Sequence, residues 1–396
     1  MLVLQNNIHI IAGAKRYCLY DLNKLMLYSL DSQDVELIWH ITNGGSATEA
    51  SQDTVNYLKE AGIIVEEQNL IPTLQSEKYY RSLNFAWIEI TQNCNLICRH
   101  CYEGASREKI IPQMSIDSFK HVVEELKSVG IDRVQLVGGE PLMHSEIEKL
   151  MAIASHSFSF VEVFTNGTLL NDHLFEIIEK TGISLAFSLY SDTPELHDYV
   201  TRTPGSYELT YRSIEQTKKR GIELRISSVE MKNLNQFTLS GLEEYHRTDL
   251  PRLTGRADLS LYDRNMLKRK LITKKTFSKP IDVHTYFANQ NTHNCFGRHL
   301  YIDYELNVFP CVMERRYSYG NLFEKSLDAI IGNGLSGLTK DHISGCKDCE
   351  FRYACFDCRP DANGNSLYSK PWYCTYNPEH GEWEDENIFI DSLFRG

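Results

Sequence analysis

The chain has 396 residues, of which 42% are hydrophobic and 24% charged, a composition ordinary for a globular protein of about two or three domains. No apolar run reaches the length that spans a bilayer, and the N-terminal residues lack the basic start and the cleavage site of a signal peptide. The formal net charge is -12, from 41 Lys and Arg against 53 Asp and Glu, which disfavours a nucleic-acid surface. We therefore expect a cytoplasmic protein that has neither a membrane nor a nucleic acid as its partner.

Short strands and two helices are expected in residues 1–78, which end in a polar segment that we interpret as a linker. The expected strands are 17–20, 25–30 and 63–66, and the expected helices follow Asp31 and run from 48 to 61. The first helix is expected to place Val35, Ile38 and Trp39 on one face. This order of elements resembles the small PqqD-like winged-helix domain that recognises leader peptides on many peptide-modifying enzymes.

The resemblance implies that an extended leader peptide adds as a strand to the edge of the small sheet, where backbone hydrogen bonds hold it. A winged helix that only packs on the enzyme, or one that binds DNA, is the alternative. The acidic charge balance makes DNA the weaker of these choices.

Strands and amphipathic helices alternate through residues 79–275, beginning with a strand at 85–90. Further strands are expected at 134–137, 160–165, 185–190 and 224–229, and helices are expected from Ser115, from about Ser145, from Asp172 and from Ser206. Repeated βα units predict a parallel sheet with the helices outside it, that is, an α/β fold.

Cys94, Cys98 and Cys101 lie in the loop that follows the first of these strands, with spacings of three and then two residues. Three thiolates in a short loop can hold three irons of a 4Fe-4S cluster and leave the fourth iron open. Zinc would need a fourth ligand, and the position of His100 between two of the cysteines makes tetrahedral binding awkward. The spacing therefore favours iron.

The cysteine loop and the downstream sequence Gly138-Gly139-Glu140-Pro141 together resemble the radical S-adenosylmethionine (SAM) superfamily. The resemblance implies a partial (β/α)6 TIM-like barrel in which the open iron chelates SAM and reduction of the cluster releases a 5'-deoxyadenosyl radical. It also implies an external electron donor such as flavodoxin or ferredoxin, and it assigns no catalytic side chain. The residues that it implies as SAM contacts are Tyr102, Gly138, Gly139, Glu140, Pro141, Asn166, Ser188 and Arg202.

Seven more cysteines lie in residues 276–396, and in a cytosolic chain metal binding explains them better than disulfides do. Their order resembles the SPASM extension, which holds two auxiliary 4Fe-4S clusters. The resemblance implies one cluster on Cys295, Cys311 and Cys358, and another on Cys346, Cys349, Cys355 and Cys374. Two features depart from the family pattern: Leu306 replaces a Gly, and two residues rather than three separate Cys355 from Cys358. Two zinc knuckles are the structural alternative. The one cysteine outside both groups, Cys18, is expected to be buried.

The three resemblances together describe a SPASM-type radical SAM maturase with SAM and three 4Fe-4S clusters as cofactors. Such an enzyme would bind a ribosomally made precursor peptide and install an oxidative intramolecular crosslink, either a thioether or a carbon-carbon bond. A peptide epimerase and a formylglycine-forming sulfatase maturase are alternatives within the enzymes. An iron-sulfur electron carrier or a zinc-stabilised binding module is the alternative outside them.

Overall fold

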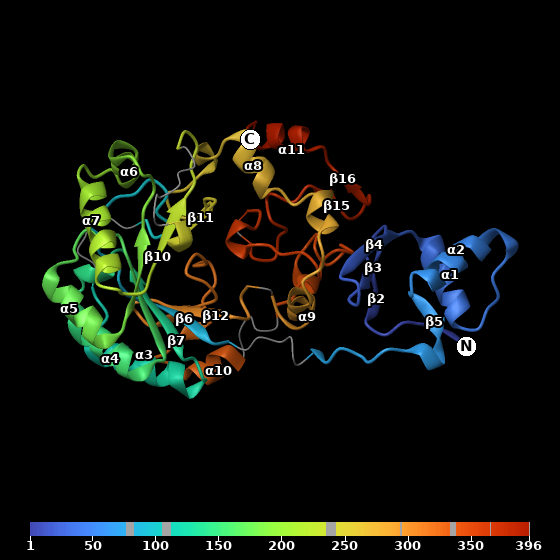
Figure 1. Ribbon diagram of the computed structural model, residues 1–396, viewed down its shortest axis with the longest axis horizontal. Helices are drawn as coiled ribbons and strands as arrows, with labels where there is room; N and C mark the ends of the chain where they lie inside the picture. Colours follow the sequence, from blue (N-terminus) through green and yellow to red (C-terminus); the bar gives the residue numbers. More distant parts are fainter. Residues whose placement is uncertain are drawn as a thin grey trace.

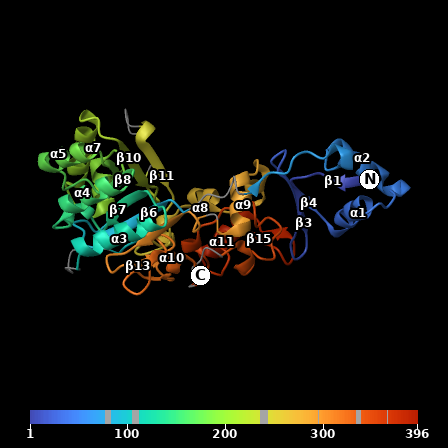
Figure 2. The same ribbon diagram turned by 90° about the horizontal axis from the view of Figure 1, so that it is seen from below.

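The computed structural model describes residues 1–76, 83–104, 112–234, 243–293, 295–332, 338–364 and 366–395. Figures 1 and 2 show three regions along the long axis of the molecule. An N-terminal region lies at one end, a parallel sheet with its helices lies at the other, and the cysteine-rich C-terminal region lies between them. In the described part of the chain, no helix is both long enough and apolar enough to cross a membrane.

Two small sheets and two helices form the N-terminal region. Its elements are β1 (Leu2–Leu4), β2 (Ile8–Ala12), β3 (Tyr17–Asp21), β4 (Met26–Leu30), α1 (Ser32–Thr42), α2 (Gln52–Glu60) and β5 (Ile64–Glu66). Strands β2, β3 and β4 form an antiparallel sheet in that order, and β1 pairs with β5. The predicted strands and helices are therefore present, and β1 and β2 are additions to the predicted order.

Asp31 directly precedes helix α1 and caps its N-terminus through a capping box. Its buried residues are Val35, Ile38 and Ile41. The prediction that Trp39 shares the inner face is wrong, because this side chain is 52% exposed. Ile41 extends the buried stripe on the other side of Ile38, which leaves Trp39 about 100° away from the centre of the stripe.

A nine-stranded sheet forms the central region, in the order β11-β10-β9-β8-β7-β6-β12-β13-β14. Its strands are β6 (Phe85–Thr91), β7 (Arg133–Gly138), β8 (Phe160–Thr165), β9 (Ser184–Ser188), β10 (Leu224–Val229), β11 (His246–Asp249), β12 (His299–Ile302), β13 (Asn307–Phe309) and β14 (Gly320–Asn321). Strands β6 to β11 are parallel, and each lies beside the next in the chain. The predicted α/β fold with a parallel sheet is confirmed.

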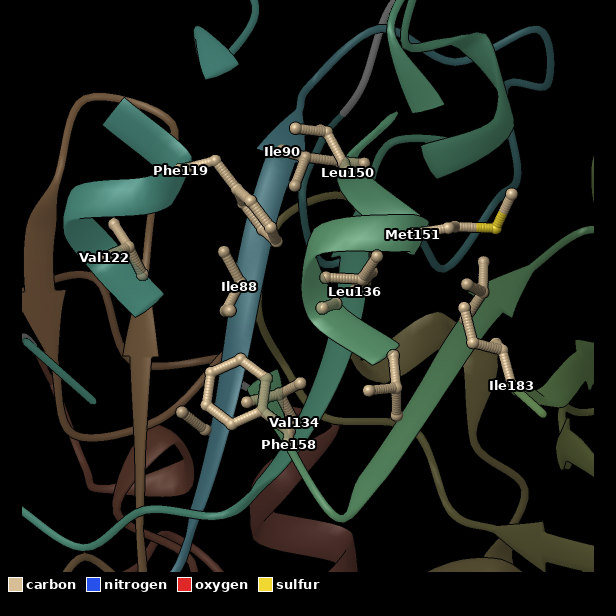
Figure 3. Packing of buried hydrophobic residues seen from close by; sticks show 14 of the residues in the cluster. Ile88, Ile90, Phe119, Val122, Val134, Leu136, Leu150, Met151, Phe158 and Ile183 are labelled. Carbon is tan, nitrogen blue, oxygen red and sulfur yellow. The ribbon is translucent and has the colours of Figure 1, made fainter. Parts of the chain in front are cut away.

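Helices cover the outer face of this sheet (Figure 1). They are α3 (Ile116–Ser128), α4 (Ile147–Ser157), α5 (Asp172–Thr181), α6 (Pro194–Thr201) and α7 (Ser206–Lys219). Helix α3 starts at Ser115, whose hydroxyl accepts a hydrogen bond from the amide three residues later. Its spacing of three and four residues brings Phe119 and Val122 against Ile88 and Ile90 of β6, as Figure 3 shows. The apolar core thus lies between helices and strands, and the carboxyl ends of the strands remain available for a site.

The C-terminal region contains little regular structure. Its elements are α8 (Arg264–Lys270), α9 (Val283–Asn291), α10 (Leu327–Gly332), β15 (Tyr376–Asn377), β16 (Glu382–Trp383) and α11 (Glu386–Leu393). Strand β12 follows α9 in the chain and belongs to the central sheet, where it pairs in parallel with β6. The segment that holds the seven cysteines is therefore attached directly to the central sheet.

The N-terminal sheet packs on the C-terminal region through aromatic side chains. The Tyr20 hydroxyl donates a hydrogen bond to the Glu350 carbonyl over 2.9 Å, and the centroids of the Tyr20 and Tyr286 rings lie 5.2 Å apart. Cys18 is fully buried in the same cluster, as predicted. These contacts hold β2, β3 and β4 against the region that carries the cysteines.

Candidate functional site

The glycine turn after β7 contacts the start of the cysteine loop at very short range. A β-carbon at Gly138 would lie 2.1 Å from the carbonyl oxygen of Thr91, and one at Gly139 would lie 2.4 Å from that of Gln92. The Gly139 amide donates a hydrogen bond of 2.9 Å to the Thr91 carbonyl. Since backbone groups make these contacts, only glycine allows this approach at either position.

Cys94, Cys98 and Cys101 cluster at the carboxyl end of β6. Burial and, to a smaller extent, the neighbouring Cys101 raise the pKa of Cys98 to about 12. Arg256 acts in the opposite direction on this pKa, and its Nε donates a hydrogen bond of 2.9 Å to the Cys98 carbonyl. Buried thiols of this kind give up their protons to a bound metal, because the metal charge replaces the missing solvation.

The loop that follows β11 also packs on the cysteine loop, and sequence reasoning missed it. Gly255 has a φ of 60°, and a β-carbon there would lie 2.3 Å from the Cys101 carbonyl oxygen. The amide of Arg256 donates a hydrogen bond of 3.0 Å to the same oxygen. A single Gly before an Arg was the only available signal, and it is too common in loops to indicate a contact.

Two neighbouring cavities open at this end of the sheet. The smaller, about 90 Å³, borders the three cysteines. The larger, about 280 Å³, is lined by side chains of β6 to β10, and both cavities are lined by His100, Tyr102, Ser188 and Tyr190. The predicted SAM contacts that line the smaller cavity are Tyr102, Gly138, Gly139, Asn166 and Ser188.

Glu140 lies behind the smaller cavity rather than on its wall. It is fully buried and accepts hydrogen bonds from the amide of Asn166 over 2.7 Å, the amide of Leu142 over 3.1 Å and the hydroxyl of Thr165 over 2.6 Å. Burial raises the pKa of Glu140 to about 7. The carboxyl group therefore positions Asn166 at the cavity.

Besides Glu140, two more of the predicted SAM contacts do not line the smaller cavity. Pro141 is the buried first residue of a short helical turn. Arg202 ends α6 with a φ of 53° and is exposed, and it lines neither of the two cavities. Arg256, in contrast, contacts the cysteine loop.

The C-terminal cysteines form the two groups that the SPASM resemblance implies. Cys295, Cys311 and Cys358 are close enough to influence one another electrostatically, and burial raises the pKa of Cys311 and of Cys358 to about 11. The four that line one narrow cavity are Cys346, Cys349, Cys355 and Cys374. Their role as cluster ligands stays a prediction.

The donor set fits iron-sulfur clusters: each of the three sites brings together three or four free cysteine side chains that are buried or half-buried. Within the described ranges, no three His, Cys, Asp or Glu side chains converge on the position of a single metal ion. Leu306, where the family pattern has Gly, adopts a φ of 67°, and its amide donates a hydrogen bond of 2.9 Å to the Asp303 carbonyl. The turn between β12 and β13 is thus kept, with Leu in a backbone conformation that favours glycine.

Residues 88–247 match the family model described as the Radical SAM superfamily. The matched span begins in β6, includes the cysteine loop and the glycine turn, and ends in β11. In residues 88–247, which make up less than half of the chain, the parallel sheet therefore coincides with a match to a superfamily of enzymes.

Relatives of this chain have different activities in their names. The AdoMet-dependent heme synthase of Methanosarcina barkeri is 28% identical over 340 residues, which cover 74% of this chain and 96% of the relative. The antilisterial bacteriocin subtilosin biosynthesis protein AlbA of Bacillus subtilis is 26% identical, over 72% of this chain and 68% of the relative. A GTP 3',8-cyclase of Desulforamulus reducens is 29% identical, over 45% of this chain and 54% of the relative.

Solved structures share the fold across most of the chain. Streptococcus suis SuiB bound to precursor peptide SuiA has a TM-score of 0.57 at 16% identity, covering 93% of this chain and 98% of that chain. Native anSMEcpe with bound AdoMet has a TM-score of 0.54 at 13% identity, covering 79% of this chain and 99% of that chain. The similarity to SuiB therefore extends over nearly the whole chain.

We predict that Glu140→Gln changes the pH dependence of stability. Folding raises the pKa of Glu140 from 4.5 to about 7, so this carboxyl group ionises at a lower pH in the unfolded chain than in the folded protein. The free energy of unfolding of the wild type therefore falls as the pH rises from 4.5 through 7. The amide cannot ionise, so the variant lacks this loss, which amounts to up to about 3 kcal/mol. Thermal unfolding midpoints of both proteins at pH 5 and pH 8 measure it. A difference between the two proteins that is the same at both pH values would contradict the prediction.

Proposed function

We propose that this chain is a radical SAM maturase that installs an oxidative intramolecular crosslink, a thioether or a carbon-carbon bond, in a ribosomally made precursor peptide. The observation that carries the proposal is the position of the 280 Å³ cavity. Its wall includes His100 and Tyr102 of the cysteine loop, and also Val312 and Met313, which directly follow Cys311. A substrate in this cavity would therefore contact both the radical-generating site and an auxiliary site.

The cysteines have two different tasks in this proposal. A SAM-binding cluster on Cys94, Cys98 and Cys101, reduced by an external flavodoxin or ferredoxin, would supply the deoxyadenosyl radical, and two auxiliary clusters would accept the surplus electron. The glycine turn and Ser188 would hold SAM in the smaller cavity. Arg252 lines the larger cavity, and its guanidinium lies 3.8 Å from the carboxylate of Asp361, close to Cys358.

A peptide substrate is supported by the names of AlbA, SuiB and anSMEcpe and by the N-terminal region. AlbA is a bacteriocin biosynthesis protein, SuiB has been solved with precursor peptide SuiA, and anSMEcpe has been solved with a peptide named Cp18Cys. The heme synthase and GTP cyclase relatives act on small molecules, and the GTP cyclase aligns over 45% of this chain only. The similarity to SuiB includes the N-terminal region, for which a small-molecule reaction offers no evident use.

The leader is proposed to dock along β4, the outer strand of the N-terminal sheet. Within the described residues, β4 pairs with β3 alone, so its other edge can accept a further strand. A cleft of about 860 Å³ runs beside it, between β4 and the C-terminal region. Its basic residues are Arg16, Lys24, Lys274 and Lys279, and they favour an acidic leader segment although the whole chain carries a net charge of -12.

The function is tested with the peptides encoded by small reading frames beside the gene. Each is incubated anaerobically with the reconstituted enzyme, SAM and a reductant. The proposal predicts 5'-deoxyadenosine and a peptide that has lost two hydrogen atoms, and Cys94→Ala should form neither product. An unchanged peptide mass with one hydrogen taken from solvent would instead show an epimerase. Formation of deoxyadenosine with a tetrapyrrole or GTP, and with no peptide, would contradict the proposal.

Leader docking predicts that Lys274→Glu/Lys279→Glu weakens binding of an acidic leader peptide. Both side chains are exposed at the cleft, so their reversal should leave the fold intact and raise Kd roughly tenfold at low salt, less at high salt. Fluorescence anisotropy of a labelled leader measures this. Lys218→Glu/Lys219→Glu on the outer helix α7 makes the same charge change away from the cleft and is the matched control. Equal weakening in both variants would point to net charge alone and would contradict docking in the cleft.

A further inference from the structure

A buried ionic network links the two groups of C-terminal cysteines. Its centre is Asp357, whose carboxylate forms ion pairs with Lys340 and Arg359 and lies 3.2 Å from Nε2 of His293. All four side chains are almost fully buried. Charged side chains are rarely buried to this degree unless something nearby compensates the cost of desolvation.

One end of the network reaches the four-cysteine group. Lys340 lines the narrow cavity together with all four of these cysteines. The ammonium group of Lys340 forms an ion pair with Oδ1 of Asp357, but its buried Nζ has no hydrogen-bond partner within the described residues, although it carries three N-H donors. The ammonium of Lys340 is therefore placed at the wall of the cavity in which the sulfur atoms of a cluster would lie.

The other end reaches the three-cysteine group. Nδ1 of His293 accepts a hydrogen bond of 3.3 Å from the amide of Cys295. Arg359 follows Cys358 directly in the chain, and its guanidinium also donates hydrogen bonds to the carbonyls of Leu367 and Ser369, over 2.8 and 2.7 Å. Cysteines of both groups also act electrostatically on the pKa of this guanidinium, so it lies within electrostatic reach of both sites.

The network carries an excess of positive charge. Lys340 and Arg359 contribute two positive charges and Asp357 one negative charge, which leaves one net positive charge in the protein interior. An uncompensated buried charge would be strongly destabilising. Thiolate-ligated clusters are anionic, and they would compensate this charge from both sides.

We propose that the network of Lys340, Asp357 and Arg359 raises the reduction potential of the auxiliary clusters, so that they accept the electron released when the peptide is crosslinked. This inference rests on the proposed function. Each reduction adds one electron to a cluster and makes it more negative, so a fixed positive charge and N-H donors near sulfur stabilise the reduced form. Lys340 is thus a tuning residue that does not touch the substrate.

The test measures midpoint potentials by EPR-monitored redox titration of the full chain after anaerobic reconstitution. All proteins carry Cys94→Ala/Cys98→Ala/Cys101→Ala, so only auxiliary clusters titrate. Lys340→Met should lower the potential by about 59 mV or more, a tenfold change in the reduction equilibrium. Asp357→Asn removes a negative charge and should raise the potential. Lys347→Met is the matched control, because Lys347 is exposed one residue after Cys346 and solvent screens its charge.

The opposite signs separate tuning from a purely structural role. If Lys340→Met loses iron, Asp357→Asn still tests the sign, and a lowered or unchanged potential in Asp357→Asn overturns the inference. Iron-loaded clusters with equal potentials in all variants overturn it too, and leave the proposed function intact. Zinc in place of iron at the seven cysteines would overturn both the inference and the electron-accepting part of the proposed function.

Discussion

The close contact between the Gly138-Gly139 turn and the end of β6 is the constraint on which the rest of the site depends. A side chain at either glycine would meet a backbone oxygen within 2.4 Å, so the turn and the cysteine loop can approach only in this form. The approach places the three cysteines at the carboxyl ends of the parallel strands, and Glu140, the next residue, brings Asn166 to the same cavity. The apolar core and the candidate site therefore occupy different parts of the sheet: the helices bury its outer face, and the site lies at the carboxyl ends of its strands.

The cysteine loop is also held from its other side, by a segment that leads to the C-terminal region. Gly255 and Arg256 contact the loop, while Arg252, a few residues earlier, pairs with Asp361 beside the three-cysteine group. The segment after β11 therefore connects the parallel sheet to the cysteine-rich region through ordinary backbone and ionic contacts. The cavity between these two regions has walls from both of them.

Sequence reasoning found the elements and residues whose signals are local. Helix α3 follows from its spacing of apolar residues and its cap at Ser115, and the two C-terminal cysteine groups follow from the resemblance to the SPASM extension. It did not find β11, because the residues His246–Asp249 are polar and show no strand pattern. It did not find the pairing of Lys340 with Asp357 either, since charged residues are expected at the surface and only the tertiary fold brings these two together inside. The prediction that Trp39 is buried was wrong for a related reason. The helical period indicates which residues share a face of the helix, but the elements packed against that face decide which of them are buried.

The measurement that tests the account most directly is the iron and sulfide content of the anaerobically reconstituted protein. The wild type is compared with Cys94→Ala/Cys98→Ala/Cys101→Ala and with Cys346→Ala/Cys349→Ala/Cys355→Ala. Three clusters predict about twelve irons in the wild type and about eight in each variant. Zinc at the C-terminal cysteines, or an iron content that neither variant lowers, would contradict a radical SAM enzyme with two auxiliary clusters.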